Sequence, residues 1–287
     1  MPELPEVETV RRQLEPALVG RTIEDAEVLD QRWSRPEAPA TVEQALRGQR
    51  IEAVERRGKY LIVRLGEARA LVMHLRMTGN LLLHPADSYP EERHLRVRFA
   101  LDDGSQLWFT DARRFGHGVV LANEALDGYF ATRLGVEPLS DALTPEFLLE
   151  LAANRKAPLK SFLLNQTGVA GIGNIYADEA LFRAHLHPLS PAGSIRLEHA
   201  EDLVEGIVAA LELGLVNGGS SIDDYRDSRG ERGSMQDEFL VHVREGEPCV
   251  RCGETIRRVV VSGRSTYFCP GCQKRLRGRR RRPALRS

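Results

Sequence analysis

The chain is short of lysine, has cysteine only near its C-terminal end, and lacks any long apolar run. Four of its 287 residues are lysines, Lys59, Lys156, Lys160 and Lys274, so chemistry that needs a side-chain amine has few candidates. No stretch of 18 apolar residues occurs, and we therefore expect no membrane partner. Acidic residues stand at the N-terminus, where a signal peptide needs basic and apolar ones, so a cytoplasmic protein is expected.

Acidic and basic residues nearly cancel over the chain but are unevenly distributed along it. The formal net charge is −1, yet residues 251–287 hold eleven arginines and one lysine against a single glutamate, a charge of +11. The preceding 250 residues then carry −12. A cationic end favours a polyanion as partner. We expect its last part, residues 275–287, to be a disordered basic tail that adds salt-sensitive affinity for nucleic acid or is simply solvated.

Hydrophobic spacing divides the chain into a β-rich first half and a helical second half. Residues 5–18 have apolar side chains at helical intervals, with Pro5 in the first turn, and predict a helix. From about residue 21 to about residue 125 the period is two, and a turn at Asp103-Gly104 joins two alternating runs. We expect an antiparallel sandwich or barrel with strands at 51–54, 60–65, 70–75, 81–84, 95–101, 106–110 and 118–122.

After about residue 130 the spacing becomes helical. Thr144-Pro145-Glu146 combines an N-cap, a first-turn proline and an acid, which is typical of a helix start. Further helices are predicted near Pro158, near Asn174 and over about 199–216. Residues 220–237 then form a polar loop that is long enough to be functional. The expected fold class is therefore α+β.

The four cysteines form two close pairs. Two residues separate Cys249 from Cys252 and Cys269 from Cys272, and sixteen residues lie between the pairs. This spacing is typical of four thiolates around one tetrahedral zinc, which would be structural because no coordination position stays open. The alternative is four buried cysteines without a metal. A hairpin is predicted between the pairs with Arg264 at its tip, where the ordinary interpretation is a solvated turn residue.

The first residues place an imino group close to several carboxylates. Pro2 follows a methionine that is ordinarily removed before a small residue, and the proline would then carry the chain's terminal amine. An α-amine titrates nearer neutrality than a lysine does, so a substantial fraction is unprotonated and nucleophilic. Glu3, Glu6 and Glu8 lie in the first turns of the expected helix, where carboxylates also stabilise the helix dipole. For Glu8 we expect only stabilisation of the helix dipole.

Both ends of the chain resemble one protein family. MPELPEVETVRR at the start and GRSTYFCPGCQK near the end, with GKYL, HLRMTG, TDARRFG and GVAGIGNIYADE between them in that order, are similar to motifs of the bacterial formamidopyrimidine-DNA glycosylase family, in its oxidised-purine branch. The likeness runs from Met1 to Lys274. It implies a bifunctional base-excision enzyme, which removes 8-oxoguanine and formamidopyrimidines from damaged double-stranded DNA and then cleaves the strand by β,δ-elimination.

The resemblance also implies a domain organisation. Residues 1–130 would form a catalytic β-sandwich led by a helix, 131–239 a helix-two-turn-helix domain with a lesion-covering loop, and 240–274 a zinc finger built on a β-hairpin. The basic tail, 275–287, follows. One structural zinc ion is expected as the cofactor, without nucleotide or magnesium. We expect a monomer associated with the bacterial nucleoid.

Five residues receive catalytic or supporting roles through the resemblance. Pro2 is the nucleophile that attacks C1′, expels the base and forms a Schiff base, while Glu3 shuttles protons beside it. Glu6 supports the amine or a water molecule. Lys59 donates a proton during β-elimination; without the resemblance it would be an ordinary exposed lysine at a strand end. Arg264 is assigned to δ-elimination, although a guanidinium is a poor acid and anchoring of a phosphate is the better interpretation.

A second group of residues is implied to bind DNA. Extraction of a base leaves a hole in the stack, and Met77 and Arg113 are expected to enter it while Phe115 wedges the opposite strand. Without the resemblance, Met77 and Phe115 would be ordinary core side chains. Arg114 is expected to be structural. The other matches are expected to contact the DNA backbone, and they are His74, His94, Arg155 and Asn174, the last of them at a glycine-rich helix start.

Two other functions stay open in the sequence. An endonuclease VIII-type glycosylase for oxidised pyrimidines would use similar chemistry, but PELPEVET and ARRFG favour the purine branch. A noncatalytic zinc-finger DNA-binding protein would have lost catalytic residues that are all present here. Met235 and His242-Val243 stand where many relatives have an aromatic residue and a Tyr-Gly pair, which leaves the lesion preference open.

Overall fold

A computed structural model describes residues 1–88, 90–222 and 224–276, and in it the chain forms two compact units. The N-terminal unit comprises Met1–Arg133 and Glu212–Glu238. The C-terminal unit comprises Leu134–Leu211 and, among the described residues, 239–276. Most of the expected basic tail, from residue 277, lies outside the described residues. Within the described ranges no helix is long and apolar enough to cross a membrane.

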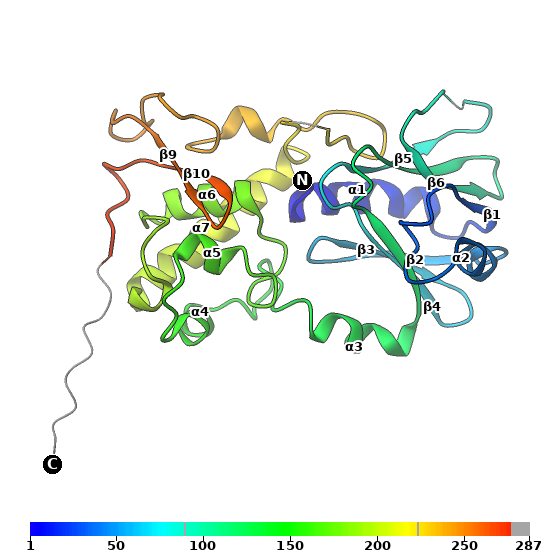
Figure 1. Cartoon of the computed structure of the whole chain (residues 1–287), viewed down its shortest axis with the longest axis horizontal. Coiled ribbons are helices and arrows are strands. Elements are labelled where there is room, and N and C mark those ends of the chain that lie inside the picture. The colour runs from blue at the N-terminus through cyan, green and yellow to red at the C-terminus, as the bar shows by residue number, and fades with distance from the viewer. Residues whose placement is uncertain (89, 223, 277–287) are drawn as a thin grey trace, which may run out of the picture. The chain divides into compact units, whose positions relative to one another are not determined.

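Helix α1 (Leu4–Leu18) opens the N-terminal unit and begins one residue before the predicted start. Its first turn is closed by two glutamates, because the backbone N–H of Glu3 donates to Oε2 of Glu6 at 2.7 Å. The helix packs against strands β2 (Ile51–Arg57) and β3 (Tyr60–Leu65) (Figure 1). Its buried apolar side chains follow the predicted helical spacing: Val7, Val10, Leu14 and Leu18.

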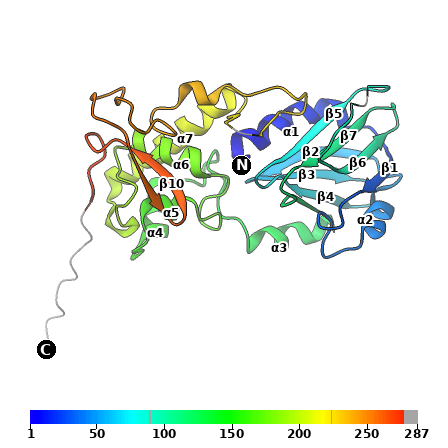
Figure 2. The ribbon, with the colours of Figure 1, turned by 45° about the horizontal axis from the view of Figure 1, so that its top comes forward.

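Two four-stranded antiparallel sheets form a sandwich in the N-terminal unit, as predicted (Figure 2). One sheet has the order β1-β6-β7-β5 and the other has the order β2-β3-β4-β8. Both contribute to one hydrophobic core, in which Trp33 contacts Phe99 and Phe109 edge-on. The strands are β1 (Ile23–Val28), β2 (Ile51–Arg57), β3 (Tyr60–Leu65), β4 (Arg69–His74), β5 (Gly79–His84), β6 (Leu95–Leu101), β7 (Gln106–Asp111) and β8 (His117–Ala122).

Strand β1 and helices α2 (Pro39–Leu46) and α3 (Leu126–Ala131) were not predicted. In β1 the pairing with β6 shifts between Ile23 and Asp25, and this irregularity interrupts the alternation of buried and exposed side chains. Helix α2 buries only Val42 and Leu46, so its periodic signal is too short to be distinctive.

The C-terminal unit contains the predicted helices and the predicted hairpin. Thr144 caps α4 (Pro145–Ala152), with its hydroxyl oxygen accepting from the N–H of Phe147 at 3.1 Å. The other elements are α5 (Leu159–Leu163), α6 (Asn174–Arg183), α7 (Leu197–Val216), which starts in this unit, and the hairpin strands β9 (Arg257–Val261) and β10 (Arg264–Phe268). Phe182 of α6 shares a small core with Cys249 and Cys269, so the hairpin module rests on this helix.

Two features of the fold differ from what the sequence indicated. The segment Glu212–Glu238 belongs to the N-terminal unit, although it follows helices of the C-terminal one. The hairpin turn consists of Ser262 and Gly263 alone, both with positive φ, so Arg264 is the first residue of β10 rather than part of the tip. The subdivision into three domains and a tail stays a prediction.

Candidate functional site

The chain's first residues are buried at the start of α1. Pro2 is buried, and Glu3 and Glu6 are each 1% exposed. Carboxylates are rarely so buried unless they are hydrogen-bonded, and here Glu6 accepts the N–H of Glu3. This pairing fixes the backbone next to Pro2, so the terminal residues are held in place rather than frayed.

Glu6 also holds the segment of residues 217–234, which we name the covering loop. Its Oε1 accepts the N–H of Ser220 at 2.7 Å, and its backbone carbonyl accepts the hydroxyl of Tyr225 at 3.2 Å. Gly219 has a φ of +81°, and a Cβ there would lie 2.7 Å from Cγ of Glu6, so only glycine permits this approach. The sequence did not indicate that Glu6 would contact a segment more than two hundred residues away.

Two amide side chains also attach the covering loop to the rest of the N-terminal unit. Gln13 of α1 donates to Oδ2 of Asp227 at 2.6 Å and accepts the N–H of Ser228 at 3.0 Å. Asn80 of β5 accepts the N–H of Arg226 at 2.8 Å. The loop is thus bound both to β5 and to α1, the helix that directly follows Pro2 and Glu3.

Lys59 occupies the two-residue turn between β2 and β3. Arg57 and Tyr60 are the last paired residues, and Gly58 supplies the positive φ of 55° that the turn requires. The Lys59 side chain is only 5% exposed, unlike an ordinary lysine at a strand end. Burial, followed by the charges of Arg76, His117 and Lys59, lowers the pKa of His74, so the Lys59 ammonium lies in the neighbourhood of that ring.

His74 lies in a row of rings on strands β3, β4 and β8. Its ring centroid is 4.6 Å from that of Tyr60, edge-on, and 5.8 Å from that of His117, stacked. Nδ1 of His74 accepts the N–H of Arg76 at 2.9 Å, so the neutral ring carries its proton on Nε2. Burial, with the charge of Arg76, holds the pKa of His74 well below its usual range. At neutral pH this ring can offer an anion one neutral donor.

Met77, Arg113 and Phe115 come from the loops that follow β4 and β7. Met77 is half-buried and follows Arg76, whose φ is +55°. Arg113 and Phe115 are exposed, and the guanidinium carbon of Arg113 lies 4.9 Å from the Phe115 ring centroid. Phe115 is 53% exposed, so it is not the core side chain that its residue type alone would suggest.

Arg114 and His94 have backbone and ion-pair contacts in the same region. Arg114 has a φ of +60°, and its Nη2 lies 2.9 Å from Oδ1 of Asp30. Hydrogen bonding to this guanidinium lowers the pKa of Asp30 to about 2, so Arg114 acts structurally, as expected. His94 is half-buried, with its carbonyl accepting the N–H of Asp111 at 2.9 Å.

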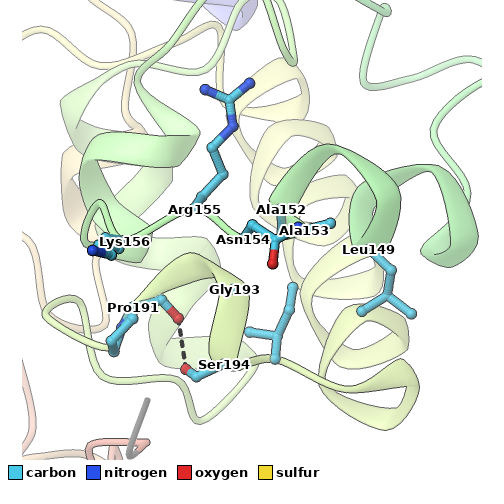
Figure 3. A pocket seen from close by; sticks show the side chains of 10 residues that line it. Leu149, Ala152, Ala153, Asn154, Arg155, Lys156, Pro191, Gly193 and Ser194 are labelled. Atoms are coloured by element: carbon cyan, nitrogen blue, oxygen red, sulfur yellow. Dashed lines mark hydrogen bonds between the residues drawn. The ribbon is translucent and has the colours of Figure 1, made fainter. Parts of the chain in front are cut away.

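Arg155 lies beside a cavity of about 830 Å³ in the C-terminal unit (Figure 3). Asn154 precedes it with a φ of +59°, and the carbonyl of Arg155 accepts the N–H of Gly193 at 2.9 Å. The Arg155 side chain is exposed and extends away from Pro191 and Ser194 (Figure 3). Arg155 and Lys156 are thus two exposed cations among the residues that line this cavity.

Asn174 is the first residue of α6 and is held by two groups that sequence analysis did not connect with it. Its Nδ2 donates to the carbonyl of Ser265 in β10 at 2.9 Å, and its own carbonyl accepts from Nζ of Lys160 at 2.6 Å. Lys160 is fully buried and pairs with Asp178 at 2.6 Å. Oδ1 of Asn174 is buried without a hydrogen-bond partner among the described residues. The helix start is thus joined to the zinc hairpin.

His242 occupies one of the positions where this sequence departs from the family pattern. Its Nδ1 lies 2.8 Å from Oδ2 of Asp178, and it is 5% exposed. Its N–H donates to Oε1 of Glu179, which also accepts the N–H groups of Leu240 and Val241. The sequence offered little signal for this cluster, because its members are distant along the chain. Two adjacent acids within an otherwise apolar helix, Asp178 and Glu179, were the only visible hint.

The four cysteines come together as the spacing predicted. Their Sγ atoms all lie within 4.8 Å of one another, with Cys249 3.8 Å from Cys272 and Cys252 3.4 Å from Cys269. Zinc–sulfur bonds of about 2.3 Å in a tetrahedron place sulfurs at about these separations. Burial, together with the neighbouring thiols, raises the pKa of Cys272, a penalty that a divalent cation would remove. These residues fit one structural zinc ion, which would join the hairpin to the preceding loop.

The predicted site residues therefore fall into two groups. The N-terminal unit holds the terminal proline and glutamates, the turn lysine, the histidines and the three wedge residues. The C-terminal unit holds Arg155, Asn174, Arg264 and the cysteines, and Arg264 is exposed at the start of β10. Asp111 supports the first group and Lys160 supports the second, each through a hydrogen bond to the backbone of a neighbouring loop or helix start. The sequence analysis gave neither residue a role in the site.

Each part of the chain matches a described protein domain. Residues 1–118 match the formamidopyrimidine-DNA glycosylase N-terminal domain and residues 134–226 match the formamidopyrimidine-DNA glycosylase H2TH domain. Residues 246–275 match the zinc finger found in FPG and IleRS. With the cysteine geometry, this last match confirms the predicted structural zinc site.

Relatives and solved structures match over nearly the whole length. The formamidopyrimidine-DNA glycosylase of Chloroflexus aurantiacus is 46% identical over 275 residues, which cover 95% of this chain and 98% of the relative. That of Symbiobacterium thermophilum is 47% identical over 293 residues, which cover 100% of this chain and 95% of the relative.

Structures with DNA show the same fold. The Lactococcus lactis enzyme with abasic-site DNA superimposes with a TM-score of 0.90 at 36% identity, over 95% of this chain and 100% of that one. A mutant of that enzyme with Fapy-dG DNA gives 0.90 at 37%, over 96% and 100% of the two chains. The resemblance stated from the motifs is confirmed, and the chain belongs to the formamidopyrimidine-DNA glycosylase family.

Proposed function

We propose that this protein removes oxidised purines, 8-oxoguanine and formamidopyrimidines, from damaged double-stranded DNA and cleaves the strand at the resulting abasic site, in base excision repair. The family membership supports a DNA glycosylase, and its relatives were crystallised on abasic-site and Fapy-dG DNA. The observation that carries the proposal is the buried N-terminus, where Pro2 precedes two glutamates that are each 1% exposed.

The reaction begins after removal of Met1. The Pro2 nitrogen attacks C1′ of the damaged nucleotide, the glycosidic bond breaks, and the base leaves with a proton. The sugar ring opens and leaves an iminium, which makes the C2′ proton acidic. Loss of that proton expels the 3′ phosphate, and a second elimination expels the 5′ phosphate. Glu3 moves protons during the opening, because it is adjacent to Pro2 and protected from bulk water.

The remaining residues bind the strand while this occurs. Lys59 supplies an ammonium group and His74 a neutral ring N–H as hydrogen-bond donors to the DNA backbone. Asn174 donates one N–H to Ser265 and has a second on the same nitrogen for a phosphate. Arg155, His94 and Arg264 supply further donors, with Arg264 anchoring a phosphate rather than transferring a proton.

The damaged base must leave the duplex before Pro2 can reach C1′. Met77, Arg113 and Phe115 fill and wedge the gap, which offsets a few kcal/mol of lost stacking. The covering loop, held on Glu6, closes over the everted base. The enzyme works as a monomer in the cytoplasm, at the nucleoid, since its relatives are bacterial and its substrate is chromosomal DNA.

A panel of duplexes tests the substrate class. Each carries 8-oxoguanine, a formamidopyrimidine or thymine glycol at the same position, and the readout is the rate of strand cleavage together with borohydride trapping. We expect rapid cleavage and trapping with the two purine lesions. Faster turnover of thymine glycol would instead identify an endonuclease VIII-type enzyme, and binding without cleavage would identify a noncatalytic zinc-finger protein.

A further inference from the structure

Asp111 lies at the end of β7, beneath the loop that carries Arg113 and Phe115. It is 1% exposed, and its two oxygens accept four hydrogen bonds. Oδ1 accepts the hydroxyl of Thr78 and the N–H of Arg113, the latter at 3.1 Å. Oδ2 accepts the N–H groups of Phe115 at 2.9 Å and Gly116 at 2.7 Å. One carboxylate therefore fixes the whole turn of this loop.

Thr78 brings the second loop into the same cluster. It directly follows Met77 and is 8% exposed, and its hydroxyl oxygen accepts the N–H of Arg113 at 3.1 Å while donating to Asp111. The next residue, Gly79, pairs with Asp111 across β5 and β7. A single hydroxyl thus links the loop after β4 to the loop after β7.

Close packing leaves both loops little freedom. A Cβ on Gly79 would lie 2.4 Å from the carbonyl oxygen of Leu75, and one on Gly116 would lie 2.5 Å from Cζ of Phe109. Both contacts are too short for any side chain. Each loop is pressed onto the sandwich, with Arg113 and Phe115 exposed and Met77 half-buried.

We propose that Asp111 and Thr78 are positioning residues that hold Met77, Arg113 and Phe115 as one preorganised wedge. This inference rests on the proposed function, in which the three side chains enter the DNA stack. A preorganised wedge fills the vacated space without first ordering two separate loops, so more of its contact energy is available to hold the base out. The Thr78–Asp111 link therefore acts on eversion of the base and not on the chemistry at C1′.

The link can be removed with little change of shape. Thr78→Val deletes the hydroxyl, and Thr78→Ser retains it. Thr110→Val is the matched control, because it deletes the hydroxyl of a neighbouring buried threonine outside the cluster. Asp111→Asn is a second disruption, since an amide NH₂ replaces one of the oxygens that accept backbone N–H groups.

Three measurements separate positioning from general structural damage. The first is single-turnover excision of 8-oxoguanine from a duplex. The second is cleavage of a duplex with a preformed abasic site, which has no base to evict. The third is the fluorescence of 2-aminopurine placed beside the lesion, which increases when the stack opens. Thermal unfolding of each variant is recorded in parallel.

Thr78→Val is expected to reduce excision about tenfold, the effect of losing one buried hydrogen-bond link, and to weaken the fluorescence change. Cleavage at the preformed abasic site should stay near the wild-type rate. Thr78→Ser should restore excision, and Thr110→Val should leave it unchanged. If Thr78→Val does not fold, Asp111→Asn is expected to show the same split between the two substrates.

Two results would overturn the inference. One is a folded variant with normal excision and a normal fluorescence change. The other is an equal loss on both substrates, which indicates general damage to the enzyme. A wild-type protein that excises neither purine lesion would refute the proposed function itself, and it is distinguishable because the variants would then have no activity to compare.

Discussion

The backbone N–H of Ser220 donates to Oε1 of Glu6 at 2.7 Å, a contact between residues at opposite ends of the N-terminal unit's sequence. The other oxygen of the same carboxylate accepts the N–H of Glu3. One buried group therefore holds both the residue after the proposed nucleophile and the covering loop.

Glu6→Gln should expose this link. The amide can accept only one of the two N–H groups and presents hydrogens to the other, which costs about 1–3 kcal/mol in a buried site. We expect excision of 8-oxoguanine to fall about tenfold to a hundredfold. Hydrogen exchange of the Ser220 amide should become faster. Glu8→Gln is the control and should change neither excision nor exchange of the Ser220 amide. Normal excision by Glu6→Gln, with a Ser220 amide that stays protected from exchange, would contradict the link.

Lys160 and Asp178 should be far more sensitive to single than to paired substitution. Both are fully buried, and their Nζ–Oδ1 distance is 2.6 Å. Lys160→Met removes the cation beside the buried Asp178 carboxylate, so it is expected to lower the free energy of unfolding by about 3 kcal/mol or more. Lys160→Met combined with Asp178→Asn should recover part of that loss in chemical denaturation. Equal losses in the single and the double variant would rule out a charge effect.

Acid should weaken the fold through the histidine row. The pKa of His117 is lowered to about 4, chiefly by burial and then by Arg76, and that of His74 is also lowered. In the unfolded chain these rings bind protons near pH 6.5, whereas in the folded chain they bind protons only at a lower pH. Stability is therefore complete above about pH 7 and falls as the pH drops from about 6.5 towards 4.

Denaturation curves at several pH values test this dependence. His117→Gln should flatten the dependence between pH 6.5 and pH 4.5, whereas His185→Gln, at an exposed histidine, should leave it unchanged. Asp30, whose pKa is lowered to about 2, adds a pH dependence only below about pH 4, where the stability that it contributes is lost. An unchanged slope in His117→Gln would show that this ring is not the cause.

The cysteine site should bind one zinc ion per chain and stabilise the hairpin. Cys252→Ala leaves three ligands, and we expect zinc content to fall below one ion per chain. Amides of β9 and β10 should then exchange faster, because the hairpin shares its small core with Cys249 and Cys269. A chain that keeps full hairpin protection after complete metal removal would show that the metal is dispensable for this element.

The sequence predicted elements well where one pattern persisted over many residues. The α1 face, most strands of the sandwich and the cysteine pairs each repeat a simple spacing, and all were confirmed. Strand β1 was missed because a shift in pairing interrupts its alternation. The predicted position of Arg264, at the tip of the hairpin, was wrong, because Arg264 is the first paired residue of β10. The turn is shorter than predicted since Ser262 takes a positive φ that its residue type does not indicate.

The supporting contacts of the site were not predictable in the same way. Asp111 gathers donors from two loops, and Glu6 holds Ser220 over 214 positions of sequence. Such contacts arise only once strands and helices are assembled, and no local spacing encodes them. The roles of Pro2, Glu3 and Lys59 came from the resemblance, while their burial came from the fold.

The most direct measurement is the location of the covalent bond to deoxyribose. Mature, zinc-loaded protein is incubated with an 8-oxoguanine duplex under borohydride, digested, and analysed by tandem mass spectrometry. We predict a sugar adduct on the N-terminal peptide, at the nitrogen of Pro2 after loss of Met1. The Pro2→Gly variant should form the adduct much more slowly than the wild-type protein. An adduct on Lys59, or no adduct at all, would contradict the account.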